Sequence, residues 1–78
     1  MSAKQAFEKI GYTQVREDDD YIIYEKAIDG GEDKKEVNFC TQLESVMVGF
    51  EIGTDTASID MRLFKAITMQ LEELGWMR

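Results

Sequence analysis

The residues of this chain that could do chemistry are one cysteine, Cys40, and a set of acids, and the chain contains no histidine. Histidine is the commonest general base and the commonest zinc ligand, so both of these roles would have to be filled by other residues. A cysteine nucleophile needs a base or a positive neighbour to become a thiolate, and the residues flanking Cys40 offer neither. We therefore expect Cys40 to be a buried or half-buried structural thiol.

The acids do not form a recognisable metal site. The segment 29–33, Asp-Gly-Gly-Glu-Asp, superficially resembles a calcium loop but lacks the alternating oxygen ligands and the final glutamate of an EF-hand. Consecutive carboxylates such as Asp18, Asp19 and Asp20 do not converge on one ion. A structural zinc site and a glycine-rich phosphate loop are also missing from the pattern. No two carboxylates stand in visibly contrasting environments. The sequence predicts a protein that is not an enzyme and that holds no metal or cofactor.

Negative charge is concentrated in one region. The net charge is −7, and residues 17–36 contribute −6 of it through nine acids and three lysines. Direct binding to nucleic acid is not expected, because the chain offers no basic face for the phosphates. Two interpretations of the acidity remain open: a solvated, solubilising surface, or an acidic contact surface that imitates nucleic acid. The residues of the second interpretation are Asp18, Asp19, Asp20, Glu32 and Asp33.

Amphipathic patterns predict a helix at each end of the chain. In residues 60–76, apolar side chains fall on one side of a wheel of about 100° per residue, and charged side chains fall on the other. Asp60 can cap the start of this helix, because its carboxylate can accept a hydrogen bond from a free backbone N–H of the first turn. Residues 2–10 repeat the pattern, with Ser2 and Gln5 forming a capping box.

The two helices end in the same pattern: apolar, two polar residues, apolar, glycine, aromatic. It reads Phe-Glu-Lys-Ile-Gly-Tyr at 7–12 and Leu-Glu-Glu-Leu-Gly-Trp at 71–76. Glycine after a helix can adopt the left-handed conformation that ends it. We therefore predict a Schellman turn at Gly75 that folds Trp76 back onto Leu71.

The charges of the last helix are arranged against its dipole. Arg62 and Lys65 lie near its start, and Glu72 and Glu73 lie near its end, whereas the dipole favours the opposite order. Met69 lies in the middle of the same outward side. Two explanations remain open: a contact surface, or a tolerated cost of roughly a few tenths of a kcal/mol.

Between the helices apolar residues alternate, as is typical of β-strands. The predicted strands are 12–16, 21–28, 36–43 and 46–52. A two-residue link between the last two strands would place Val37 opposite Ile52 and Phe39 opposite Phe50. Inward residues would then meet inward residues along the whole pair.

We predict an α+β fold with a single small domain, residues 1–78: helix, three- or four-stranded antiparallel meander, helix. The fold has two layers, with both helices on one face of the sheet. The core residues expected from both layers are Phe7, Ile10, Tyr12, Phe39, Phe50, Ile52, Phe64, Ile67, Leu71 and Trp76.

The face of the sheet without helices is a candidate partner surface. The register of residues 21–28 is open; if Ile22 and Tyr24 face the helices, the alternate residues point the other way. An apolar patch then forms on that free face, and contiguous patches of this kind usually mark an interaction site. Its residues are Tyr21, Ile23, Cys40 and Met47.

Three segments together resemble a group of known proteins. They are Ala-Phe-Glu-Lys-Ile-Gly-Tyr at 6–12, Lys-Ala-Ile at 65–67 and Glu-Glu-Leu-Gly-Trp at 72–76. The chain resembles small uncharacterised proteins encoded by phages, prophages and mobile elements of Gram-positive bacteria. The resemblance implies an origin on a mobile element and carries no catalytic or binding residues.

These observations predict a non-enzymatic phage or prophage accessory protein that acts as a protein–protein interaction module. Its expected partner is another protein, with a second copy of the chain (a homodimer) among the candidates. The alternative is an acidic inhibitor that imitates nucleic acid and occupies a host nucleic-acid-binding or defence enzyme. No apolar run approaches membrane-spanning length and the N-terminus lacks the apolar core of a signal peptide, so we expect a protein of the bacterial cytoplasm without a membrane partner.

Overall fold

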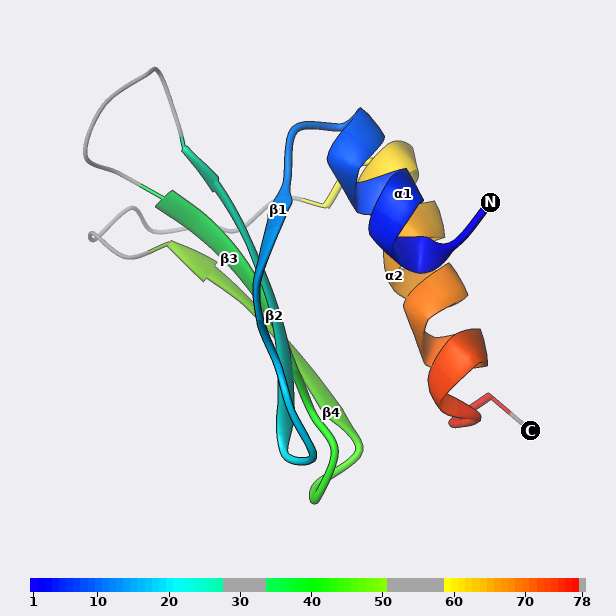
Figure 1. Ribbon diagram of the computed structural model, residues 1–78. Coiled ribbons are helices and arrows are strands. Elements are labelled where there is room, and N and C mark those ends of the chain that lie inside the picture. The colour runs from blue at the N-terminus through cyan, green and yellow to red at the C-terminus, as the bar shows by residue number, and fades with distance from the viewer. Residues whose placement is uncertain (28–33, 51–58, 78) are drawn as a thin grey trace.

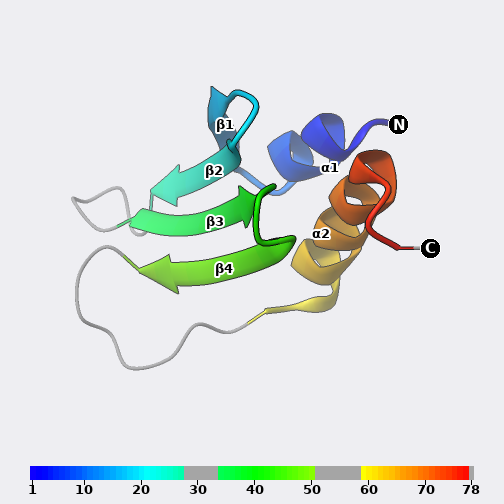
Figure 2. The same ribbon diagram turned by 90° about the horizontal axis from the view of Figure 1, so that it is seen from below.

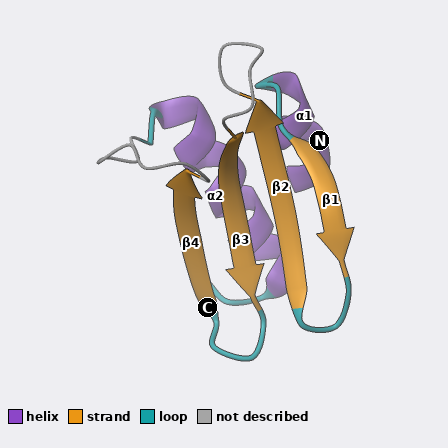
Figure 3. Ribbon diagram, turned by 90° about the vertical axis from the view of Figure 1, so that its left-hand side faces the viewer, coloured by secondary structure: helices purple, strands orange, loops and turns teal. Residues whose placement is uncertain are grey.

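The computed structural model describes residues 1–27, 34–50 and 59–77, and of Phe50 the backbone only. The elements in chain order are α1 (Ala3–Lys9), β1 (Thr13–Glu17), β2 (Tyr21–Ala27), β3 (Lys34–Cys40), β4 (Ser45–Phe50) and α2 (Met61–Leu74). The strands form one antiparallel sheet in the order β1-β2-β3-β4. Both helices lie on the same face of this sheet (Figures 1 and 3), and they lie side by side there (Figure 2). The predicted α+β fold is confirmed, with four strands.

Both helices begin at the predicted caps. The Ser2 hydroxyl accepts a 3.2 Å hydrogen bond from the backbone N–H of Gln5, and the Gln5 side chain accepts one of 2.9 Å from the N–H of Ser2. Asp60 Oδ1 accepts a 2.8 Å bond from the N–H of Leu63. These contacts satisfy backbone donors that have no partner inside a helix. The helix starts therefore follow from local sequence.

Both helices also end in the same way. At α1, Gly11 has φ 93° and the N–H of Tyr12 donates 2.9 Å to the carbonyl oxygen of Phe7. At α2, Gly75 has φ 76° and the N–H of Trp76 donates 3.0 Å to the carbonyl oxygen of the residue five positions earlier. These are Schellman endings, in which glycine takes the left-handed conformation without a Cβ clash. The prediction of a shared stop signal is confirmed.

The register of β3 and β4 differs from the predicted one. Val37 lies opposite Val48 and Phe39 lies opposite Val46. The strands are joined by the four-residue turn 41–44, so the predicted pairing through a two-residue link is wrong. The difference is an even number of positions, and inward residues therefore still face inward residues.

Two features of the turn explain this register. Glu-Ser is not a favoured two-residue hairpin turn, and the observed turn uses Glu44 at φ 48°. The β2–β3 ladder ends at Thr41, whose N–H and hydroxyl both donate to the carbonyl oxygen of Asp20. Leu43, predicted at the end of a strand, consequently lies at the turn with 76 % of its surface exposed.

The core lies between the sheet and the two helices. Stacked rings of Phe7 and Tyr24, with centroids 3.8 Å apart, form its centre, and Tyr12 and Phe39 meet Phe7 edge-on. Such offset and edge-on pairs are the favoured aromatic arrangements. The buried core residues are Phe7, Tyr12, Ile22, Tyr24, Val37, Phe39, Leu63, Ala66 and Ile67.

Most predicted core residues that the structure describes are confirmed, and one is wrong. Ile10, Leu71 and Trp76 are half-buried and pack against the core. Phe64 is 54 % exposed. The other two predicted core side chains, those of Phe50 and Ile52, lie outside the described part of the structure.

The error at Phe64 has a structural cause. Helix α1 packs beside α2, and the side chain of Glu73 accepts a 2.6 Å hydrogen bond from the N–H of Ala3 in α1. The buried side of α2 includes Ala66 and Gln70, and the Gln70 side chain accepts a hydrogen bond from Tyr24 of β2. Phe64, at the opposite margin of a broad apolar stripe, is left outside the core.

Candidate interaction surfaces

The predicted partner surface lies on the free face of the sheet. Because Ile22 and Tyr24 are buried beneath the helices, the alternate residues of β2 point away from them. Strand pairing then aligns two rows across that face: Tyr21 with Cys40 and Ser45, and Ile23 with Asn38 and Met47. All four predicted surface residues therefore share one face of the sheet. We call Tyr21, Ile23, Cys40 and Met47 the free-face patch.

The members of the free-face patch differ in exposure. Met47 is 58 % exposed, Tyr21 and Ile23 are half-buried, and Cys40 is buried by its neighbours. The guanidinium of Arg16 lies 4.6 Å from the centroid of the Tyr21 ring, within the range of a cation–π contact. The patch thus has an apolar surface with a cation at its β1 side.

A polar atom at the centre of this face has no partner. Asn38 lies between Ile23 and Met47 in the register, and its Oδ1 is buried without a hydrogen bond, the one such side-chain atom among the described residues. Its amide Nδ2 donates only a long 3.4 Å bond to Glu36. Buried polar atoms are nearly always paired in folded proteins. Because neighbouring side chains cover this oxygen, it offers no open contact to a partner.

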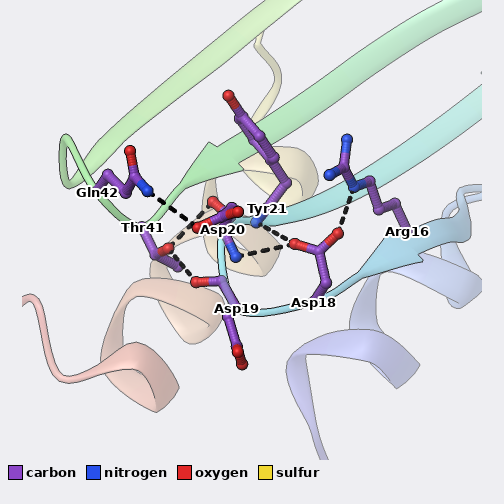
Figure 4. A network of polar contacts seen from close by, with 7 residues as sticks. All are labelled: Arg16, Asp18, Asp19, Asp20, Tyr21, Thr41 and Gln42. Carbon is purple, nitrogen blue, oxygen red and sulfur yellow. Dashed lines mark hydrogen bonds and ion pairs between the residues drawn. The ribbon is translucent and has the colours of Figure 1, made fainter.

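In the acidic turn between β1 and β2, carboxylate oxygens are largely engaged in hydrogen bonds within the protein (Figure 4). Asp18 Oδ1 accepts hydrogen bonds of 2.8 Å from the N–H groups of Asp20 and Tyr21, and Oδ2 accepts 2.6 Å from Nε of Arg16. The bond from Arg16, followed by those from the backbone, holds the pKa of Asp18 below its ordinary value. This carboxylate closes the hairpin as an Asx-turn.

The other four residues of the predicted acidic surface differ in their contacts and in whether the structure describes them. Asp20 Oδ1 accepts a 3.0 Å hydrogen bond from the Gln42 amide, which ties the turn to the β3–β4 hairpin. The side chain of Asp19 points away from this network (Figure 4). Glu32 and Asp33 lie outside the described residues. Among the three predicted acids that the structure describes, Asp18, Asp19 and Asp20, Asp19 is therefore the one whose carboxylate has no internal contact shown.

Cys40 and the side chains of the metal-binding types are the remaining candidates for chemistry. The thiol of Cys40 is buried on the free face, as expected for a structural cysteine. Within residues 1–27, 34–50 and 59–77, no three side chains of the metal-binding types come together as an ion would need. In the same part of the chain, no helix has the length and apolar character needed to cross a membrane.

A further candidate surface lies on the outer side of α2, where a contact surface is one of the two explanations that the sequence left open for the charge order. Six residues of α2 line a shallow groove on its outer side, and two of its apolar residues are well exposed, Met61 at 66 % and Phe64 at 54 %. We call this surface the α2 strip. The outward Met69 and the charges set against the dipole were its sequence signals. Its residues are Met61, Phe64, Lys65, Thr68, Met69 and Glu72.

Comparison with known proteins gives no assignment for either surface. The chain matches no protein-family model, no curated protein and no solved structure.

Proposed function

We propose that this protein is a non-enzymatic protein–protein interaction module that binds its partner on the free face of the sheet. The observation that carries the proposal is the free-face patch, which leaves Met47 exposed and Tyr21 and Ile23 half-covered on a face with no helix over it. Interaction surfaces typically combine an apolar centre with arginine and aromatic residues. The free-face patch with the neighbouring Arg16 has this composition.

The side chains on the free face of the sheet indicate which groups a partner would need in order to bind there. Apolar side chains of the partner would pack against Ile23 and Met47, because methionine is unbranched and adapts its shape. A carboxylate of the partner would fit against Arg16, whose side chain is half exposed. The resemblance described above adds that the partner is a protein of the bacterial cytoplasm, and the protein itself a phage or prophage accessory protein.

The test compares two lysine substitutions on the same hairpin. Met47→Lys places a charge in the free-face patch, and Leu43→Lys places the same charge at the exposed turn nearby. With tagged protein and lysate of a Gram-positive host, quantitative mass spectrometry should show that a captured protein is lost about tenfold with Met47→Lys and retained with Leu43→Lys. Equal capture by both variants, or no capture by the original chain, would contradict the proposal.

The acidic alternative predicts sensitivity at other residues. An inhibitor that imitates nucleic acid would bind its target through Asp19 and the acids outside the described residues, in a salt-dependent way. Asp19→Asn should then weaken the captured complex, and Met47→Lys should leave it intact. The same pull-down therefore separates the two functions.

A further inference from the structure

The α2 strip lies away from both the sheet and α1. The line of α2 that faces the rest of the protein contains the buried Ala66, Gln70, which accepts a hydrogen bond from Tyr24 of β2, and Glu73, which accepts one from α1. At about 100° per residue, the strip is centred roughly 140° around the helix from that line. Phe64 and Met61 therefore form an apolar surface that no described residue covers.

Two charged side chains of the α2 strip lie at equal distances from its midpoint along the helix. Lys65 and Glu72 are seven residues apart, two helical turns, and both line the groove. Their axial separation is about 10 Å, and the point midway between them falls between Thr68 and Met69. Neither charge has an ion-pair partner in the described part of the chain. The first turn of α2 has no acid and its last turn has no base, so the helix dipole does not explain their order.

We propose that the α2 strip is a self-association surface on which a second copy of this chain packs its own α2 in antiparallel orientation. A two-fold axis at Thr68–Met69 places Lys65 of each copy opposite Glu72 of the other, because the two residues are equally far from the axis. The strip is thus self-complementary in charge, as a closed two-fold interface requires.

The arrangement also accounts for the charge order along the helix. In an antiparallel pair, Lys65 of one copy faces the C-terminal half of the other helix, and Glu72 faces the N-terminal half. Each charge is then favourably placed against the dipole of the partner copy. Phe64 and Met61 are covered by the same contact. An arrangement that is unfavourable in one copy becomes favourable in two.

The dimer is expected to be weak. Helix α2 has 14 residues, a length of about 21 Å, so one helix face buries less surface than a standard stable interface. The free face of the sheet lies on the other side of each copy and stays open (Figure 1). The proposal therefore does not depend on the proposed function, and a dimer would offer the partner two binding faces.

Charge exchange tests the arrangement. Lys65→Glu makes both cross-contacts repulsive, as does Glu72→Lys, and each should weaken dimerisation about tenfold or more. The double variant K65E/E72K restores two attractive contacts and should recover the dimer. An equimolar mixture of the two single variants should form a heterodimer. Sedimentation equilibrium with concentrations up to about 1 mM covers the weak range.

Matched controls carry the same charge changes on α1. Lys4→Glu and Glu8→Lys alter exposed residues outside the strip and should leave the dimer unchanged. Salt alone is a poor test, because it screens the cross-contacts and also the repulsion between two copies of net charge −7. Circular dichroism of each variant confirms that it is folded.

Each outcome of these experiments either supports the proposed dimer or overturns it. Loss of the dimer in both single variants, with recovery in the double variant and in the mixture, supports the proposal. A monomer at every concentration overturns it. A dimer that persists in Lys65→Glu and Glu72→Lys also overturns it, because such a dimer uses another surface, for example the uncharged edge strand β4.

Discussion

The hydroxyl of Tyr24 donates a 2.6 Å hydrogen bond to Oε1 of Gln70, joining β2 to α2 inside the core. Tyr24 is fully buried and Gln70 is 5 % exposed, the one buried polar residue among those the structure describes. The Gln14 amide of β1 donates a second, 3.3 Å bond to the same hydroxyl oxygen. Buried polar groups that are fully paired favour one arrangement of the elements over others. This contact fixes how α2 lies across the sheet.

Tyr24→Phe should lower the free energy of unfolding by about 1–3 kcal/mol, because it leaves Gln70 buried without its donor. Gln70→Met should cost less, since Tyr24 keeps its contact with Gln14. Chemical denaturation of the two single variants and the double variant measures the coupling. The double variant should be more stable than the sum of the single losses predicts. Simple additivity would contradict the role given to this contact.

Stability should fall in alkaline solution because of two buried phenols. Burial, reinforced by Asp60, raises the pKa of Tyr12 to about 12, and burial raises that of Tyr24 as well. A raised pKa favours the neutral folded form, so the contribution of Tyr12 is complete below pH 10 and is lost as the pH rises from about 10 to 12. Thermal unfolding across this range should show a smaller decline for Tyr12→Phe. An equal decline in both proteins would refute this explanation.

The acids of the β1–β2 turn should differ in their effect on folding. Asp18→Ala should lower the melting temperature, because Asp18 accepts two backbone bonds and the Arg16 contact, while Asp19→Ala should leave it nearly unchanged. The pKa of Asp18 is lowered, so its contribution is present above its ordinary pKa and is lost as the pH falls through the lower folded value. Melting temperatures at neutral and acidic pH measure this. The difference between the variants should shrink in acid, and a constant difference would argue against it.

Truncation of two neighbouring residues of α2, Leu63 and Phe64, should lower stability by unequal amounts. Leu63 is 2 % exposed, and Leu63→Ala should cost about 2–5 kcal/mol of unfolding free energy through lost burial and a cavity. Phe64→Ala removes a larger but 54 % exposed side chain and should cost less than about 1 kcal/mol in dilute protein. Urea denaturation of both variants gives the comparison. A larger loss at Phe64 would place it in the core, as the helical pattern alone suggests.

Local sequence was sufficient for the ends of the elements. The capping contacts of Ser2 and Asp60 and the left-handed glycines at 11 and 75 involve residues at most five positions apart. Such contacts depend on little besides the chain nearby, so their residue types predict them directly. The alternation of apolar residues likewise predicted which residues of β3 face inward, because the strand period fixes the face, but it left the inward face of β2 open.

Contacts between elements needed the tertiary structure. The turn between β3 and β4 begins at Thr41, whose hydroxyl donates to the carbonyl oxygens of Asp19 and Asp20 in another hairpin. The burial of Gln70 depends on its contact with Tyr24 of β2. Neither relation leaves a periodic signal in the sequence, because it joins residues far apart along the chain.

The sequence by itself determined the helix ends and the inward face of β3, because each follows from local hydrogen bonds or from the strand period. The tertiary structure decided which face of β2 turns inward, and with it the free-face patch, because Ile22 and Tyr24 are buried beneath the helices. Only the tertiary structure decided that Phe64 belongs to an outward strip, with Lys65 and Glu72 lining the same groove. A helix can bury only the part of its apolar stripe that its neighbours reach, and the position of α1 sets that part.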